Sequence, residues 1–143
     1  MPDRADLSTG NIAPDFSFKD LDGKSYKLSD FRGKIVLLDF WGLWCAPCIA
    51  EVPNLAAAYQ RLKEKGFEVI SLDKGDTVEN LRKFIAKKQM IWTHTQTDEV
   101  LLQLYRVDRY PTYYLLHKEG KVISDTMRAG DEMYKKVEEM LGN

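Results

Sequence analysis

The chain contains two cysteines, Cys45 and Cys48, and only Ala46 and Pro47 lie between them. A disulfide that serves stability usually closes a long loop, because the entropy that it removes from the unfolded chain grows with loop length. A bond across so short a segment would stabilise the fold little. The pair therefore indicates chemistry, namely the reversible formation and reduction of a disulfide.

Metal binding is another common use of a Cys-x-x-Cys pair. A structural zinc site needs four ligands, usually cysteines and histidines. The chain has two histidines, His94 and His117, which lie far from the cysteines and from each other in the sequence. The sequence therefore favours redox chemistry, and it predicts neither a metal site nor a separate cofactor beyond the cysteine pair.

The cysteines stand where a buried strand is expected to end and a helix to begin. The apolar run from Ile35 to Phe40 is typical of a central strand, and a helical pattern starts at Ala46. The amides at a helix N-terminus carry partial positive charge, which stabilises a thiolate. We therefore expect Cys45 to be the exposed, acidified nucleophile and Cys48 to be less accessible.

Three neighbours of the cysteines also have predictable roles. Pro47 suits the first turn of a helix, because it lacks an amide hydrogen that would be unpaired there. Trp41 and Trp44 are expected to supply apolar surface around the sulfur atoms. Residues 41–48 thus form the predicted reactive segment.

The rest of the chain alternates strand-like and helix-like patterns. Strands are predicted at 14–18 and 24–28, forming a hairpin, and at 35–40, 67–72, 91–95, 112–116 and 121–123. Helices are predicted at 46–66 and 131–141. Two further helices are predicted to begin at a capping box of Asp76 and Glu79 and at a cap formed by Asp98. This order implies an α/β sandwich with a mixed sheet. Residues 1–11 are expected to be a flexible arm, and 12–143 a single domain.

The composition is that of an ordinary soluble domain and excludes several classes of function. The chain has 143 residues, 44% of them hydrophobic, with 21 Lys and Arg against 22 Asp and Glu. A net charge of −1 gives no electrostatic footprint for nucleic acid. No apolar run approaches the roughly 20 residues needed to span a bilayer. We expect a monomer without a nucleic-acid partner and without stable membrane insertion.

Several motifs follow one another in order. The segment Asp39-Phe-Trp-Gly-Leu-Trp-Cys-Ala-Pro-Cys48 continues to Pro53, which gives Trp-Cys-x-Pro-Cys-x-x-Glu-x-Pro. Residues 13–17 and 28–34, and Tyr110-Pro111-Thr112, add three further motifs. Together they resemble the TlpA/ResA-like group of bacterial thioredoxin-fold proteins from about residue 12 to the end. The resemblance implies a thioredoxin-like three-layer sandwich, with helices flanking a mixed central sheet and an extra N-terminal β-hairpin.

The resemblance also implies a mechanism and a set of active-site residues. Cys45 would attack a disulfide of a partner protein, and Cys48 would resolve the mixed disulfide and leave the pair oxidised. The loop of Tyr110 and Pro111 matches the family's cis-proline loop, so Pro111 is expected to be cis and to lie against the sulfurs.

Two carboxylates complete the expected site. Thioredoxins have an aspartate at the position of Asp39, buried beneath the cysteines, where it exchanges a proton with the second sulfur. Many ResA-like proteins have an uncharged residue there, so this chain follows the thioredoxin pattern. Burial should raise the pKa of Asp39. Glu51 follows Cys48 by three residues and shares its helix face; it is either a second active-site carboxylate, coupled to Asp39, or an ordinary solvated residue.

Two other functions on the same fold are weighed against disulfide exchange. A peroxidase would have Thr or Ser three residues before the cysteine and proline four residues earlier, but Gly42 and Leu38 stand there. A copper chaperone commonly has three residues between its cysteines and a suitably placed histidine. Neither pattern is present, so both functions are less favoured.

The direction of electron flow does not follow from the motif. The resemblance favours a reductant of protein disulfides that receives electrons from an upstream thiol reductase or other donor, with cytochrome c maturation as a typical setting. It also favours the bacterial periplasm or the outer face of the cell envelope, which is compatible with a signal or anchor outside this sequence. A cytoplasmic location stays open.

Overall fold

The fold is built from alternating strands and helices in the order that the sequence predicts. The computed structural model describes residues 6–124 and 130–142. Its elements are β1 (Ser17–Lys19), β2 (Ser25–Lys27), the 3-10 turn η1 (Leu28–Phe31), β3 (Ile35–Trp41), α1 (Ala46–Leu62), the 3-10 turn η2 (Lys63–Lys65), β4 (Phe67–Asp73), α2 (Val78–Lys88), β5 (Thr93–Gln96), α3 (Glu99–Leu104), β6 (Thr112–Leu116), β7 (Val122–Ser124) and α4 (Asp131–Leu141).

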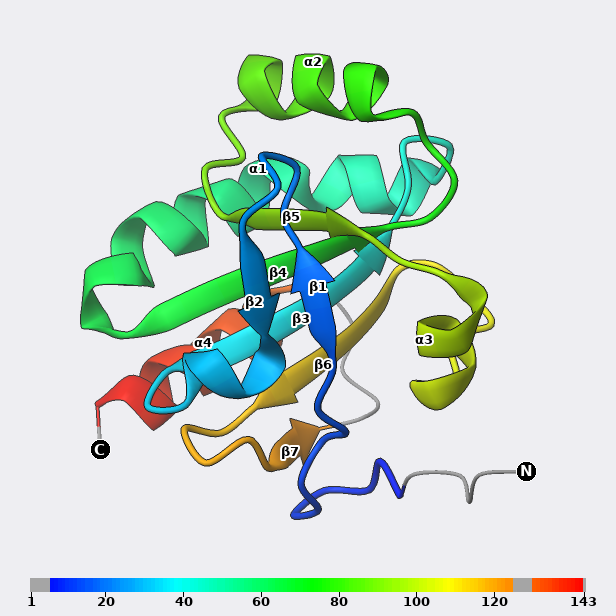
Figure 1. The fold of residues 1–143 in the computed structure, drawn as a ribbon. Helices are drawn as coiled ribbons and strands as arrows, with labels where there is room; N and C mark the ends of the chain where they lie inside the picture. The colour runs from blue at the N-terminus through cyan, green and yellow to red at the C-terminus, as the bar shows by residue number, and fades with distance from the viewer. Residues whose placement is uncertain (1–5, 125–129, 143) are drawn as a thin grey trace.

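A five-stranded mixed sheet, in the order β5-β4-β3-β6-β7, forms the middle layer (Figure 1). The central strand β3 runs parallel to β4 and antiparallel to β6, and all seven of its residues are buried. The strands β1 and β2 form a separate antiparallel hairpin in front of this sheet (Figure 1). The predicted mixed sheet and N-terminal hairpin are thus confirmed.

The two faces of the sheet are covered by different elements, because successive side chains of a strand point to opposite faces. Ile35, Leu37 and Trp41 of β3 pack with α1, α2 and α4 in one apolar cluster. Leu38 and Phe40 pack in a second cluster with η1, α3 and the hairpin. The alternation places Asp39 on the first face, under α1.

Local signals account for most boundaries, but one predicted cap is wrong. Asp98 caps α3 as expected, through the amide of Leu101. The cap of α2 is Thr77, whose hydroxyl accepts from the amide of Asn80, so the predicted capping box is absent. Asp76 instead bonds to the loop that carries the cysteines, because a tertiary partner is within reach of its carboxylate.

Part of the expected N-terminal arm, residues 1–5, lies outside the described residues. The described part of the arm is held against β7 by two hydrogen bonds. The amide of Gly10 donates to the carbonyl of Val122 (2.8 Å), and the amide of Val122 donates to the carbonyl of Asn11 (2.8 Å). Leu7 is buried in the cluster around η1 and α3. Residues 7–11 therefore contribute to the packing of the domain.

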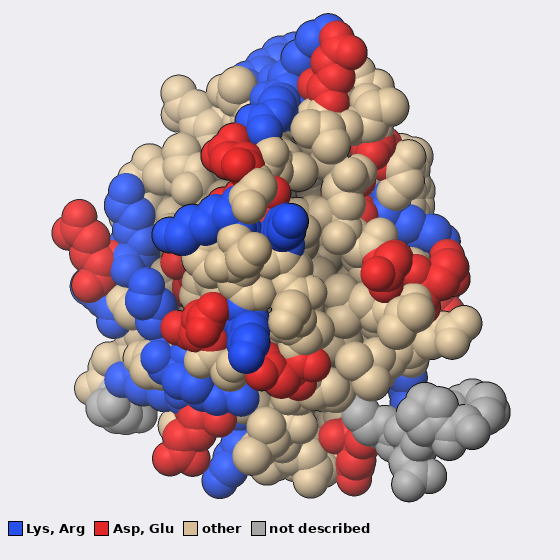
Figure 2. All heavy atoms as spheres, viewed as in Figure 1, with Lys and Arg blue, Asp and Glu red and all other residues tan. Residues whose placement is uncertain are grey.

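Positive and negative side chains intermix over the face seen in Figure 2, as the near-zero net charge suggests. The patches on this face are small and alternate in sign. Among the helices of the described ranges, none is both long and apolar enough to cross a membrane.

Candidate active site

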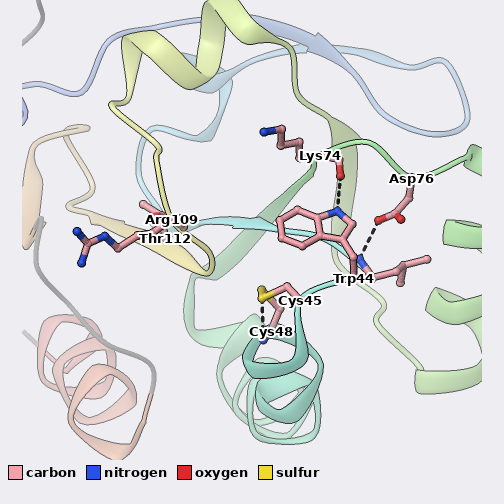
Figure 3. The surroundings of a disulfide bond; sticks show 8 residues. Trp44, Cys45, Cys48, Lys74, Asp76, Arg109 and Thr112 are labelled. Atoms are coloured by element: carbon pink, nitrogen blue, oxygen red, sulfur yellow. Dashed lines mark hydrogen bonds between the residues drawn. A yellow bond between two sulfur atoms is a disulfide. The ribbon is translucent and has the colours of Figure 1, made fainter.

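The two cysteines form a disulfide at the N-terminus of α1 (Figure 3). Their Cα atoms are 5.3 Å apart. Cys45 is the N-cap residue of the helix, and its Sγ accepts a hydrogen bond from the amide of Cys48 at 3.2 Å. Pro47 stands in the first turn, as predicted. The same amide and the helix dipole would stabilise a thiolate on Cys45 after reduction.

The expectation that Cys45 is the more exposed cysteine is wrong for this oxidised form. Cys45 and Cys48 are each 4% exposed. The disulfide holds both sulfurs within the apolar cluster that includes Trp41, Val52 and Tyr113. The predicted role of Trp41 as apolar surface around the sulfur atoms is compatible with its place in this cluster.

Trp44 and Tyr110 form an aromatic pair beside the disulfide. Trp44 is 55% exposed, and its ring lies edge-to-face with that of Tyr110 at 4.9 Å between centroids. The ammonium of Lys74 lies 5.6 Å from the centre of the Tyr110 ring, within the range of a cation–π contact. Gly42 leaves room for the indole, since a Cβ there would overlap the Trp44 ring.

The segment after β4 is bonded to the end of β3 and to the loop before α1 by three hydrogen bonds, which we call the loop latch. Figure 3 shows the two bonds that involve the Trp44 indole and the Asp76 carboxylate. The indole Nε1–H of Trp44 donates to the carbonyl of Lys74 at 2.8 Å. The amide of Leu43 donates to Oδ2 of Asp76 at 2.8 Å. The amide of Lys74 donates to the carbonyl of Trp41 at 2.9 Å. The latch fixes the backbone on which Trp44 and Cys45 stand.

Asp73 supports the latch from the end of β4. Its Oδ2 accepts from the amide of Asp76 (3.1 Å) and from Nε2 of Gln96 (3.2 Å). Burial, reinforced by the Asp76 carboxyl, raises the pKa of Asp73. Two carboxyl groups thus meet at the base of this loop.

The Tyr110–Pro111 peptide bond is cis, as the resemblance predicts. The antiparallel register pairs Thr112 with Phe40, so the loop before β6 arrives at the carboxyl end of β3. The contact between Tyr110 and Trp44 brings this loop beside the cysteines. In Figure 3 the segment from Arg109 to Thr112 lies on the side of the disulfide away from Asp76.

Asp39 lies in the middle of β3 and is 4% exposed. Its direct neighbours across the sheet are Ser71 of β4 and Tyr113 of β6. The hydroxyl of Ser71 donates to Oδ2 of Asp39 at 2.8 Å. Burial raises the pKa of Asp39 to about 7, and the charge of Glu51 adds to this increase, while the Ser71 bond opposes it.

Glu51 is not an ordinary solvated residue, because it is only 8% exposed. Its Oε1 accepts from Nδ2 of Asn54 at 2.8 Å. Its charge raises the pKa values of Asp39, Tyr113 and Tyr134, although burial is the larger cause in each case. The structure therefore brings both predicted carboxylates to the same buried region behind the cysteines.

The sequence predictions missed three residues of this site. Ser71 and Trp92 form a hydrogen-bond chain to Asp39, in which the indole Nε1–H of Trp92 donates to Oγ of Ser71 at 2.8 Å. For Asp76 the sequence pattern predicts a helix cap, whereas its carboxylate bonds to the amide of Leu43. The available signal for Ser71 was a single hydroxyl residue within the apolar run 67–72, on a strand expected beside β3.

His94 lies in the buried region next to Trp92 and bonds to the backbone. Nε2 of His94 lies 2.8 Å from the carbonyl oxygen of Met90, and burial lowers the pKa of His94 to about 4. Within 6–124 and 130–142, no group of three or more His, Cys, Asp or Glu could hold a metal ion.

Replacing Asp76 tests the loop latch. In Asp76→Ala the amide of Leu43 loses its acceptor, so we expect its hydrogen exchange to be faster by roughly tenfold or more, as loss of a hydrogen bond to a carboxylate implies. Asp76→Asn keeps an oxygen at the same place and should retain most of the protection. Amide exchange measured by NMR checks this, and equal protection of Leu43 in Asp76→Ala and in the unmodified protein would contradict it.

Comparison with known proteins agrees with this geometry. The model of the AhpC/TSA family matches residues 9–124. The chain is 36% identical over 136 residues to the thiol-disulfide oxidoreductase ResA of Bacillus thuringiensis subsp. konkukian, covering 94% of this chain and 78% of that protein. ResA of Bacillus subtilis is 36% identical over 118 residues, which cover 82% of this chain and 66% of that protein.

Solved structures give the same assignment. The thioredoxin domain of a thiol-disulfide oxidoreductase from Bacteroides vulgatus superposes with a TM-score of 0.85 at 33% identity, covering 95% of this chain and 99% of that one. A thiol:disulfide interchange protein from a Bacteroides species superposes with a TM-score of 0.85 at 33% identity, covering 96% of this chain and 92% of that one. With its cysteine pair at a helix N-terminus, the chain belongs to the AhpC/TSA family of thioredoxin-fold proteins, and within it to the ResA-like thiol–disulfide oxidoreductases.

Proposed function

We propose that this oxidoreductase reduces disulfides in partner proteins, with Cys45 as the attacking thiolate and Cys48 as the resolving one. The observation that carries the proposal is the position of Cys45 as the N-cap of α1, where its sulfur accepts the amide of Cys48. A thiolate there gains stabilisation that Cys48, inside the first turn, does not share.

The exchange proceeds in two balanced steps. The thiolate of Cys45 attacks one sulfur of the substrate disulfide; a bond forms between them, and the other substrate sulfur leaves and takes up a proton. Cys48 then loses its proton and attacks Sγ of Cys45, which releases the second substrate sulfur as a thiol. The substrate gains two electrons, and the pair Cys45–Cys48 ends as a disulfide that an upstream thiol donor must reduce.

Asp39 is proposed to exchange the proton of Cys48. It lies on the sheet face that α1 covers, and its raised pKa suits a group that accepts and returns a proton near neutral pH. Glu51, whose charge raises the pKa of Asp39, is proposed to tune this exchange. Burial, and after it the charge of Glu51, disfavours the ionised form of Asp39, so Asp39 retains its proton up to a higher pH.

The substrate is proposed to bind over the aromatic pair and the cis-proline loop. The exposed ring of Trp44 and the half-buried Tyr110 offer apolar surface beside the sulfurs. Pro47 is exposed on the first turn of α1, and Pro111 leads into β6. A peptide next to its disulfide would thus contact side chains from both loops.

The reducing direction and the cellular location rest on similarity to ResA proteins. We propose that the chain works in the periplasm or on the outer side of a bacterial cell envelope, with cytochrome c maturation among its settings. An upstream thiol reductase would supply its electrons. The single-domain boundary at residue 12 and the monomeric state are proposed as well.

The two cysteines should give opposite phenotypes when they are replaced. Cys45→Ser should abolish reduction of a disulfide protein such as insulin, by about 10³-fold or more, because the attacking sulfur is lost. Cys48→Ser should accumulate a mixed disulfide with the substrate, visible by mass spectrometry under non-reducing conditions. Unchanged insulin reduction by Cys45→Ser would contradict the assignment. So would a mixed disulfide that accumulates in Cys45→Ser and not in Cys48→Ser.

The reduction potential tests the direction of electron flow. For a reductant we expect a value near that of thioredoxin, about −270 mV, when the protein is equilibrated with glutathione or dithiothreitol buffers at pH 7. A value near about −120 mV would identify an oxidant and refute the proposed direction.

Replacing Asp39 tests the proton step. In the unmodified protein the decay of the mixed disulfide should accelerate as pH rises through about 7, because the carboxylate form of Asp39 accepts the proton of Cys48. Asp39→Asn should slow this decay by roughly 10²-fold and remove the rise near pH 7. Acid quenching followed by mass spectrometry measures the decay, and an unaltered pH profile would exclude the role.

The stability of the same variant is the control. The pKa of Asp39 is about 7 in the folded protein and 3.8 ordinarily, so between these values the folded state retains a proton that the unfolded state has released. The free energy of unfolding therefore falls as pH rises from about 4 to about 7. Asp39→Asn avoids this loss and should be the more stable protein at pH 8, so that slow exchange cannot be assigned to unfolding.

A further inference from the structure

A buried hydrogen-bond chain connects β5 to the acidic group beneath the cysteines. Trp92, immediately before β5, donates through Nε1–H to Oγ of Ser71, and Ser71 donates to Oδ2 of Asp39, both at 2.8 Å. Ser71 is fully buried and Trp92 is 5% exposed. The chain is thus shielded from water along its length.

The direction of both hydrogen bonds follows from the chemistry of the donors. An indole nitrogen can donate but cannot accept, so Oγ of Ser71 must be the acceptor for Trp92. A hydroxyl has one hydrogen, and with its acceptor side occupied it directs that hydrogen to Asp39. Oδ2 of Asp39 is therefore held as an acceptor.

Aromatic contacts hold the indole in the orientation that this chain needs. The ring of Trp92 stacks on His94, with centroids 5.5 Å apart, and meets Tyr59 edge-to-face at 5.6 Å. Rotation of Trp92 would break these contacts together with the bond to Ser71. The indole therefore acts as a fixed donor.

The other groups around Asp39 provide no compensating positive charge. Glu51 faces it from α1, Tyr113 from β6 and Tyr134 from α4, and the pKa values of both tyrosines are raised, chiefly by burial. His94, behind Trp92, is neutral at pH 7 because burial lowers its pKa to about 4. Among these neighbours, Ser71 is the group that stabilises the carboxylate.

We propose that Ser71, oriented by Trp92, is the positioning residue for Asp39: through Oδ2 it holds the carboxyl that exchanges a proton with Cys48. This proposal rests on the proton role assigned to Asp39 above. By donating to the carboxylate, Ser71 lowers the pH at which Asp39 ionises and so opposes part of the effect of burial. Ser71, oriented by the Trp92 indole, thus stabilises the carboxylate form of Asp39, as a nearby cation would.

The test is the titration of Asp39 in the oxidised protein, followed by its side-chain carboxyl ¹³C signal. Ser71→Ala should move the midpoint upward by about one pH unit or more, since a hydrogen bond to the charged form is lost. Ser71→Thr, which keeps the hydroxyl, should restore the midpoint toward that of the unmodified protein. Trp92→Phe should move it upward by less, because Ser71 remains but is no longer oriented.

Ser25→Ala, an exposed serine of β2, is the matched control and should leave the midpoint unchanged. An unchanged midpoint in Ser71→Ala would overturn the proposal, and in Trp92→Phe it would overturn the role of the indole. If Ser71→Ala does not fold, Ser71→Thr and Trp92→Phe carry the test. The pH profile of mixed-disulfide decay separates the two proposals: a shifted Asp39 midpoint with an unshifted decay profile supports the positioning by Ser71 and refutes the proton role of Asp39.

Discussion

The burial of a carboxyl group in the central strand, on the sheet face covered by the helix that begins at the cysteine pair, is the constraint on which the rest of this site depends. An ionised carboxylate is costly in an apolar interior, and burial raises the pKa of Asp39 to about 7. The helix N-terminus favours negative charge on Cys45. The site thus combines a helix N-terminus that stabilises a thiolate with a buried carboxyl whose pKa lies near neutral pH, and disulfide exchange requires proton movement.

The sheet fixes this arrangement through its register. β3 is the central strand, so Asp39 has a neighbour on each side, Ser71 from β4 and Tyr113 from β6. The same antiparallel pairing places Thr112 beside Phe40, and hence the loop of Pro111 at the end of β3. The carboxyl ends of the parallel strands β3 and β4 meet at one edge, where the loop latch joins their two loops. One topology therefore positions the sulfurs, the buried carboxyl and the aromatic surface.

Local patterns predicted the elements well, because each carries its own signal. The strand 112–116 and the helix 131–141 occur with the predicted bounds, and the cysteine pair stands at the predicted strand–helix junction. Asp39 and the cis-proline loop came from the family resemblance. The missed features are tertiary contacts. Ser71 bonds to Asp39, which lies 32 positions away in the sequence, and Asp76 accepts the amide of Leu43 and does not cap α2. The burial of Cys45 likewise depends on packing within the apolar cluster, which no local pattern encodes.

The coupling between Asp39 and the cysteines is tested most directly by comparing the ionisation of Asp39 in the oxidised and the reduced protein. We expect a midpoint near pH 7 in the oxidised protein, and a higher midpoint after reduction, because a thiolate on the cysteine pair adds a like charge near the carboxyl. The Cβ signal of Cys48 should change over the same pH range. A midpoint near pH 4 in both states, or one that is identical in the two states, would contradict the coupling between Asp39 and the cysteines.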